Sequence, residues 1–410
     1  MRVAFGVIGG AFWTGGLNYL ESLVSALQDR RSLGITPLLF AAPDADQAIV
    51  DRLAPYFPEP PRVSPAWCRT GPRRALRRIS SVVLQRDSIA EREFRRMSAD
   101  VVFQHSVWYG LRFRVPTVAW IADFQHRRCP EMFSARNRLA RDIGYRMLSH
   151  SADALVLSSA DALNDCRALY PHAAVRCHAL PFVPRLGAVA PASALHELLG
   201  RYGLPPKFIF LPNQLWLHKN HLAVIAALEL LGRSGDRPMV VACGNPEDYR
   251  HPDHPQRVIA AAASPSLRGS FRFLGMIPRA DLTGLMRLSA AVINPSLSEG
   301  WSTTVEESKA LGVPMLLSDI PVHREQAMDM ARYFDPRSPE SIAATLRAAW
   351  PELEAGPRPE RESLARAAHA QARLAFAGLF AQIAASAAAQ AHARRSRARH
   401  ARFNASVPGR

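Results

Sequence analysis

The segment 294–307 combines two spaced acidic residues with a glycine and several hydroxyl side chains. Glu299 lies in a loop that follows a predicted strand, and a helix is predicted to begin around Ser302. Glu307 falls about one turn inside that helix, on a face that can point back to the loop. The free backbone N–H groups at the helix start, near Ser302 and Thr303, form an anion site that the helix dipole strengthens. The spacing therefore predicts a diphosphate site flanked by two carboxylates that can hold sugar hydroxyls.

A purely structural interpretation accounts for only one acid of this segment. Thr303 and Glu306 have the spacing of a capping box, and acidic residues are favoured in the first turn of any helix. We therefore predict a cap at Glu306 and assign it no function. The cap does not explain Glu299 or the loop at Gly300 and Trp301.

The elements that must position these residues alternate along the chain. Short apolar runs separated by amphipathic stretches predict parallel sheets covered on both faces by helices. In such folds ligands bind beyond the carboxyl ends of the strands. The predicted strands are 2–8, 36–41, 100–104, 117–121, 153–157 and 176–180 in a first series, and 207–211, 238–242, 271–274, 290–294 and 314–317 in a second.

Two successive series predict an α/β chain of two doubly wound domains, which suits a length of 410 residues. A proline-rich stretch that begins at Pro181 separates the series. We expect a first domain over 1–183, a linker over 184–206, a second domain over 207–358, a helix over 359–392 that packs back on the first domain, and a disordered basic tail over 393–410.

The segment around Glu299 and Glu307 resembles the donor motif of the retaining glycosyltransferases of family 4. The resemblance includes the two glutamates with an intervening Gly-aromatic-Ser, a preceding Pro295-Ser296, and a following Leu-Gly-x-Pro at residues 311–314. It implies the GT-B fold, in which two Rossmann-like domains face a cleft. The first domain would then lie on the acceptor side, and the second would bind a nucleotide sugar.

A second block, residues 211–221, resembles the start of the C-terminal domain in the same family. There a basic pair normally grips the donor diphosphate. Lys219 fills the lysine position. Asn213 stands where many members have arginine, so half of the clamp is missing or is replaced by a neutral donor. Weaker matches are Gly15-Gly16-Leu17-Asn18-Tyr19 after the first strand and Asp123-Phe124-Gln125-His126 after the strand 117–121.

The resemblance implies a role for each matched residue. Glu307 would accept hydrogen bonds from the ribose, Glu299 would hold a hydroxyl of the donor sugar, and Lys219 would neutralise the leaving diphosphate. His126 would lie near the anomeric carbon, although it can also be an ordinary loop histidine. The catalytic set would be His126, Lys219 and Glu299, and the nucleotide-sugar-binding set Gly15, Gly16, Asn213, Gln214, Lys219, Gly300, Trp301, Ser302, Thr303 and Glu307.

Gly15 and Gly16 would let the first-domain backbone approach the phosphates closely, although they can also simply form a turn. A metal ion is not expected, because a lysine and a helix start can neutralise the charge of the diphosphate. The lone Asp44-Ala45-Asp46 follows a predicted strand, where helix capping explains it.

The resemblance therefore implies a retaining transferase that moves a hexose from a nucleotide-diphosphate sugar, such as GDP-mannose or a UDP-hexose, to a glycan or lipid-linked acceptor. Cell-surface polysaccharide synthesis is the expected context, and no cofactor is expected. Two alternatives stay open: a nucleotide-sugar epimerase of the same fold, and a non-catalytic protein that binds nucleic acid or an anionic surface.

Composition suits a folded enzyme, since 48% of residues are hydrophobic and 21% are charged. The five cysteines are scattered without paired spacing, which argues against a disulfide framework or zinc site and favours a cytoplasmic location. No stretch is predicted to span a membrane; the alanine-rich residues 376–391 are predicted to be a helix.

The net charge of +16 is concentrated in places. Residues 62–96 hold ten arginines against three acids, which predicts peripheral contact with an anionic membrane unless the arginines are merely solvated. Only Trp67 and Phe94 interleave with them, so we expect no nucleic-acid partner.

Overall fold

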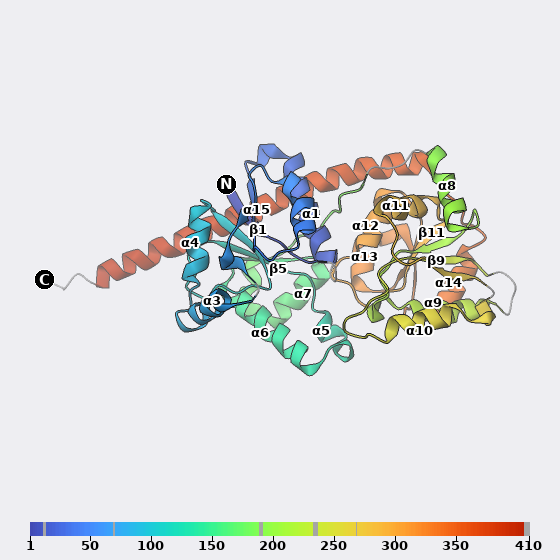
Figure 1. Cartoon of the computed structure of the whole chain (residues 1–410), viewed down its shortest axis with the longest axis horizontal. Helices are drawn as coiled ribbons and strands as arrows, with labels where there is room; N and C mark the ends of the chain where they lie inside the picture. Colours follow the sequence, from blue (N-terminus) through green and yellow to red (C-terminus); the bar gives the residue numbers. More distant parts are fainter. Residues whose placement is uncertain (11–13, 69, 188–191, 233–236, 268, 406–410) are drawn as a thin grey trace. The chain divides into compact units, whose positions relative to one another are not determined.

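The chain divides into two compact units in the computed structural model (Figure 1). Unit 1 comprises Met1–Phe124, Ala135–Val183 and Arg373–Arg410, and unit 2 comprises Gln125–Ser134 and Pro184–Ala372. The structure describes all residues except 11–13, 69, 188–191, 233–236, 268 and 406–410.

Unit 1 is built on a parallel sheet whose described strands run in the order β3-β2-β1-β4-β5-β6-β7. The strands are β1 Arg2–Gly6, β2 Thr36–Ala41, β3 Arg62–Val63, β4 Val101–His105, β5 Thr117–Ile121, β6 Ala154–Leu157 and β7 Cys177–Ala179. The α-helices are α1 Thr14–Asp29, α2 Gln47–Leu53, α3 Pro72–Val83, α4 Ser88–Arg96, α6 Ala135–Ser151, α7 Ala160–Leu169 and most of α15 Pro359–Ala405. Short 3₁₀ turns are η1 Arg31–Leu33, η2 Ala54–Tyr56, η3 Pro65–Trp67 and η5 Pro171–Arg176.

Helix α15 provides part of the core of unit 1. Its Phe380 is fully buried and lies 5.8 Å, between ring centroids, from both Phe5 of β1 and Phe103 of β4. Among the described residues, one stretch, Pro359–Ala393 of this helix, is long and apolar enough to cross a membrane by length and composition alone. Aromatic packing explains its apolar side as that of a helix lying on the sheet.

Unit 2 is built on a second parallel sheet, whose described strands run in the order β10-β9-β8-β11-β12-β13. The strands are β8 Ile209–Leu211, β9 Val240–Ala242, β10 Phe271–Phe273, β11 Ala291–Asn294, β12 Met315–Ser318 and β13 Ala331–Phe334. The α-helices are α5 Gln125–Arg128, α8 Ala192–Tyr202, α9 His221–Leu231, α10 His254–Ala262, α11 Arg279–Leu288, α12 Thr303–Ala310, α13 Pro321–Ala327 and α14 Pro339–Ala349. The 3₁₀ turns are η4 Pro130–Met132, η6 Leu217–Lys219, η7 Pro265–Leu267 and η8 Met328–Met330.

Strand alternation divides the core of unit 2 into two layers. Ile209 and Leu211 of β8 point to one face, where they pack with α9, α10 and α14. Phe208 and Phe210 point to the other, where they pack with α8 and α11. Because both faces are covered, the central strands β8, β9 and β11 are almost wholly apolar, as the sequence pattern predicts.

The predicted fold class, two doubly wound parallel α/β domains, is confirmed. Several of the predicted bounds differ. Residues 125–134, expected in the first domain, belong to unit 2. Residues 192–202 of the expected linker form α8, which packs on α11 within unit 2. Helix α15 continues to Ala405, into the region expected to be a disordered tail, and residues 406–410 lie outside the described part of the chain.

Candidate functional site

Two loops meet at the carboxyl edge of the unit 2 sheet, beyond the neighbouring strands β8 and β11. From β8 the chain continues to β9 and β10 on one side, and from β11 to β12 and β13 on the other. The boundary between the adjacent strands β8 and β11 is therefore a topological switch point, the place where open α/β sheets bind ligands. Lys219 follows β8 and Glu299 follows β11, and Lys219 Nζ donates to Glu299 Oε1 at 2.6 Å.

The turn that carries Lys219 is tied to the loop that carries Glu299. Lys219 ends η6, and Asn220 follows it in the left-handed conformation with a φ of 58°. Asn220 Nδ2 donates to the carbonyl of Pro295 at 3.1 Å, and the N–H of Leu297 donates to the carbonyl of His218 at 2.8 Å. These bonds hold the lysine over the loop after β11.

Glu299 is a buried and fully ionised carboxylate. Its side chain is 8% exposed. Burial raises the pKa of Glu299, but the positive charge of Lys219 outweighs burial and lowers this pKa to about 2. Lys219 and Glu299 thus form an ion pair to which water has little access.

Two buried histidines lie beside this pair and are kept neutral. Burial, and then the charge of Lys219, lowers the pKa of His218 well below its ordinary value. Burial lowers the pKa of His323 to about 4, although the Glu299 carboxylate opposes this shift. His323 Nδ1 donates to the carbonyl of Ser318 at 3.1 Å, which leaves its Nε2 as an acceptor with no hydrogen-bond partner among the described residues.

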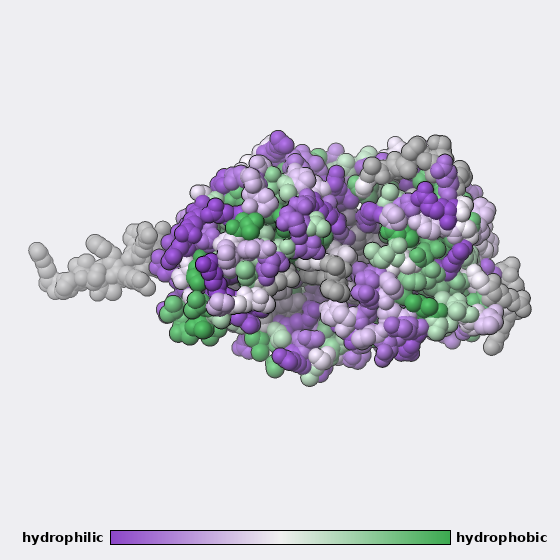
Figure 2. Space-filling view, in the orientation of Figure 1, coloured by the Kyte–Doolittle hydropathy of each residue, from purple (hydrophilic) through white to green (hydrophobic). Residues whose placement is uncertain are grey.

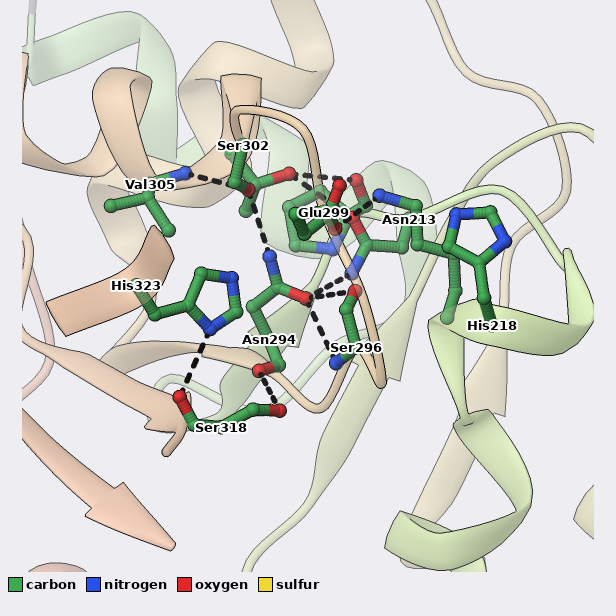
Figure 3. A network of polar contacts seen from close by, with 12 residues as sticks. Asn213, His218, Asn294, Ser296, Glu299, Ser302, Val305, Ser318 and His323 are labelled. Carbon is green, nitrogen blue, oxygen red and sulfur yellow. Dashed lines mark hydrogen bonds and ion pairs between the residues drawn. The ribbon is translucent and has the colours of Figure 1, made fainter. Parts of the chain in front are cut away.

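A buried amide network supports the same loops, with Asn294 at its centre (Figure 3). Asn294 Oδ1 accepts from Asn213 Nδ2 at 3.1 Å and from Ser296 Oγ at 2.7 Å, while Asn294 Nδ2 donates to Ser302 Oγ at 2.9 Å. Asn213 Oδ1 in turn accepts from Thr304 Oγ1 at 3.1 Å. One N–H of the Asn213 amide and its oxygen are therefore engaged in this network, and the role of Asn213 as a neutral diphosphate donor stays a prediction.

The start of α12 differs from the predicted capping box. The N-cap is Ser302, whose Oγ accepts from the N–H of Val305, and the N–H of Ser302 donates to Gln326 Oε1 at 2.9 Å. Glu306 does not close a box with Thr303; its Oε1 accepts from Gln326 Nε2 at 3.1 Å and from Lys309 Nζ. The capping-box prediction was wrong, because a glutamine from α13 satisfies the cap. The N–H of Thr303 lies in the first turn, where helices have no carbonyl to face it.

Glu307 lies on the side of α12 towards Arg279, with which it forms an ion pair. The Glu307 side chain is only 6% exposed, whereas that of Arg279 is 49% exposed. Burial, and then the charge of Glu307, raises the pKa of the nearby Cys243 thiol to about 12. Glu307 is thus held at the edge of the site by a residue that solvent can reach.

Gly244 lets the loops after β8 and β9 pack together. Its φ of 151° suits glycine, and a Cβ there would lie 2.6 Å from the carbonyl oxygen of Asn213 and 2.8 Å from Cα of Gln214. Gln214, Gly300 and Trp301 are partly exposed on these loops.

The remaining predicted residues lie elsewhere. His126 is buried in α5, in the segment 125–134 that belongs to unit 2, and its ring faces Phe133 with centroids 6.4 Å apart. Gly15 and Gly16 belong to unit 1, in the first turn of α1 rather than in a loop. Their roles stay predictions. Asp46 caps α2 by accepting from the N–H of Ala48, which confirms the capping interpretation of that acid.

Four residues that shape the site were not singled out from the sequence: Arg279, Asn294, His323 and Gln326. A signal existed for two of them. Asn294 ends one buried strand and His323 comes shortly after the end of another, β12, and polar residues at such positions are expected at the carboxyl edge of a sheet. The site as a whole has a lysine and an arginine that can bind a polyanion, and two carboxylates that can accept hydrogen bonds from hydroxyl groups. Among the described residues, no group of three His, Cys, Asp or Glu side chains is placed to hold a metal ion.

Comparisons with known proteins place this site in context. Residues 201–370 match the family model described as Glycosyl transferases group 1. The serotype-specific mannosyltransferase WbdA of Escherichia coli is 30% identical over 188 residues, which are 43% of this chain. The chain covers only 21% of the length of WbdA.

Solved structures with the same fold extend over nearly the whole chain. HepE of Anabaena, in complex with UDP and glucose, matches with a TM-score of 0.66 and 16% identity, over 94% of this chain and 100% of its own. WaaG, a glycosyltransferase involved in lipopolysaccharide biosynthesis, matches with a TM-score of 0.57 and 15% identity, over 92% of this chain and 95% of its own. The fold is that of GT-B glycosyltransferases, and the family match supports the group 1 family.

Proposed function

We propose that this chain is a glycosyltransferase that moves a hexose from a nucleotide-diphosphate sugar to a glycan or lipid-linked acceptor. The observation that carries the proposal is the Lys219–Glu299 pair at the switch point of unit 2. It lies inside the region that matches the group 1 family. HepE binds UDP and glucose, and WbdA is named a mannosyltransferase, so UDP-hexoses and GDP-mannose are the first donors to test.

In this proposal the donor binds by replacing the partners of two ion pairs in the site. The diphosphate takes the place of Glu299 beside Lys219, and the released Glu299 carboxylate accepts a hydrogen bond from a hydroxyl of the sugar. Glu307 exchanges Arg279 for the ribose in the same way. The first-turn N–H of Thr303 and the α12 dipole attract the distal phosphate.

We propose that the reaction retains the anomeric configuration. The acceptor hydroxyl oxygen bonds to the anomeric carbon on the face from which the diphosphate oxygen departs, and the hydroxyl proton passes to the leaving phosphate. Lys219 stabilises the negative charge that grows on that phosphate, and this electrostatic contribution is commonly the largest in catalysis. No step in the proposal requires a metal ion.

We propose the cytoplasmic side of a membrane, during synthesis of a cell-surface polysaccharide, as the setting. WaaG, with the same fold, is involved in lipopolysaccharide biosynthesis, and WbdA is described as serotype-specific. An acceptor of this kind is large and hydroxyl-rich, which suits a site that faces solvent through Arg279 and the loop at Trp301.

The test is acceptor-dependent release of nucleoside diphosphate. Purified protein is incubated with UDP-glucose, UDP-galactose or GDP-mannose, with and without polysaccharide fragments, and free UDP or GDP is measured by chromatography. We expect release only when donor and acceptor are both present, and loss of release in Lys219→Met but not in Asp319→Asn. Conversion of the sugar without release would instead identify an epimerase, and salt-sensitive DNA binding without turnover would favour the non-catalytic alternative.

A further inference from the structure

Helix α3 in unit 1 turns its apolar side to solvent. Leu76, Ile79, Val82 and Val83 are each more than half exposed, and Leu84 just beyond the helix is exposed as well. Spacings of three and four residues place the first four on one side of the helix. Figure 2 shows hydrophobic atoms gathered at the lower left, where Figure 1 labels α3. A helix that packs on a core has the opposite orientation.

The inward side of α3 is polar and firmly bonded. Arg77 Nε donates to Asp87 Oδ2 at 2.7 Å, and Arg77 Nη1 donates to the carbonyl of Ala66 at 2.9 Å. The Arg77 guanidinium also lies over the ring of Trp67, 4.9 Å from its centroid. Ser81 is buried, and its Oγ donates to the carbonyl of Arg77. A buried ion pair and backbone bonds therefore set the orientation of α3, and its apolar row is left outward.

Only part of the positive charge that the sequence shows over residues 62–96 lies unpaired beside this apolar row. Arg73 and Arg78 make no ion pair among the described residues, and they flank the apolar row on either side at 3.6 residues per turn. Helix α3 contains no acidic residue. Several other arginines of residues 62–96 are already paired: Arg77 with Asp87, Arg86 and Arg95 with Glu91, and Arg96 with Glu93.

We propose that α3 is an interfacial helix that lies on an anionic lipid bilayer. The row from Leu76 to Val83 enters the acyl boundary, while Arg73 and Arg78 extend sideways to lipid phosphates. An outward apolar face flanked by cations is the pattern of helices that bind in the plane of a membrane. The flanking positive charge selects anionic lipid over a neutral apolar surface.

Co-sedimentation of the full chain with vesicles of phosphatidylglycerol and phosphatidylcholine tests the proposal. We expect binding to these vesicles that weakens with salt, and weaker binding to phosphatidylcholine alone. Leu76→Gln with Ile79→Gln should weaken binding about tenfold or more, because two large apolar side chains no longer enter the bilayer. Arg73→Gln and Arg78→Gln should each weaken it about fivefold. The matched control is Ile259→Gln with Leu364→Gln, two exposed apolar residues of unit 2.

Fluorescence separates insertion from misfolding. In Ile79→Trp, brominated lipid should quench the added tryptophan, whereas in Ile259→Trp it should not. The proposal is overturned if the α3 double variant binds vesicles as the control does, or if Ile79→Trp is not quenched. It is also overturned if the parent is a dimer that Leu76→Gln with Ile79→Gln dissociates, since a second copy would then cover the apolar row.

Discussion

Lys219 Nζ lies 2.6 Å from Glu299 Oε1, so the two side chains assigned to different parts of a ligand are held in one ion pair. They come from loops beyond the neighbouring strands β8 and β11. In the proposed exchange, a diphosphate takes the place of Glu299 beside Lys219 and frees that carboxylate for a hydroxyl group. The charges of Lys219 and Glu299 thus neutralise each other within the protein.

The first prediction concerns the stability of that pair. The two side chains are 16% and 8% exposed, so removing one partner leaves a charge with little water to solvate it. Lys219→Met or Glu299→Gln should each lower the free energy of unfolding by about 3 kcal/mol. The double variant should lose less than the sum of the two, because the partners are coupled. Urea unfolding followed by tryptophan fluorescence measures all three.

Arg324 and Asp319 supply the matched control. Their side chains are 53% and 48% exposed, so Asp319→Asn should cost less than about 1 kcal/mol. Equal losses in Lys219→Met and Asp319→Asn would contradict a buried, coupled pair at the site.

The second prediction concerns pH and His323. Its folded-state pKa is lowered to about 4 by burial, below the ordinary value of 6.5. Between these values the unfolded chain binds the proton and the folded chain does not. Stability should therefore fall as the pH falls from 6.5 to 4, by about 1.4 kcal/mol per pH unit for this histidine. His323→Asn should remove that share of the slope.

His105 of unit 1 is a useful comparison, because burial lowers its pKa to about 4 as well. His105→Asn should reduce the slope by a similar amount without changing the affinity for UDP or GDP. A parent whose stability is flat over this range, or a His323→Asn slope equal to that of the parent, would refute the assignment of a neutral buried His323.

The third prediction concerns Asn213, which the family resemblance places at a basic position of the diphosphate clamp. Asn213→Ala removes one hydrogen-bond partner each from Asn294 Oδ1 and Thr304 Oγ1, which should cost about 1–3 kcal/mol of stability. Nucleoside diphosphate affinity should fall less than in Lys219→Met, because the amide is engaged inside the protein. Thermal unfolding and calorimetry on both variants decide this. An Asn213→Ala protein of normal stability that binds diphosphate as poorly as Lys219→Met would mean that Asn213 contacts the ligand.

The sequence predicted most of the fold because its strands are buried on both faces. Runs such as 290–294 and 117–121 are apolar without alternation, and helices cover both sides of each sheet. Two strands, β3 and β13, were not predicted. β3 has only two residues, both exposed, and β13 carries Arg332 and Tyr333 at an edge of its sheet. Neither position imposes an apolar pattern that a sequence could reveal.

The site was predictable only to the level of its motifs. The segment 294–307 revealed Glu299 and Glu307, because a strand, a loop and a helix start follow one another closely. It could not reveal their partners. Lys219 lies 80 residues from Glu299 in the sequence, and Arg279 lies 28 residues from Glu307. Gln326, which replaces the expected capping box, comes from helix α13, beyond β12. Such contacts depend on strand order, and no local spacing encodes them.

The most direct test of the central claim, a nucleotide-sugar site at the switch point of unit 2, is calorimetry of UDP and GDP with two glutamate variants. Glu307→Ala should weaken diphosphate binding by about 1.5–3 kcal/mol, because hydrogen bonds to a charged group are lost. Glu299→Ala should bind the bare diphosphate at least as tightly as the parent, because Lys219 no longer has a competing partner. The adjacent Glu306→Ala, whose carboxylate contacts Gln326 and Lys309, should bind it normally. If Glu307→Ala binds the diphosphate as tightly as the parent does, the nucleotide does not lie where this account places it.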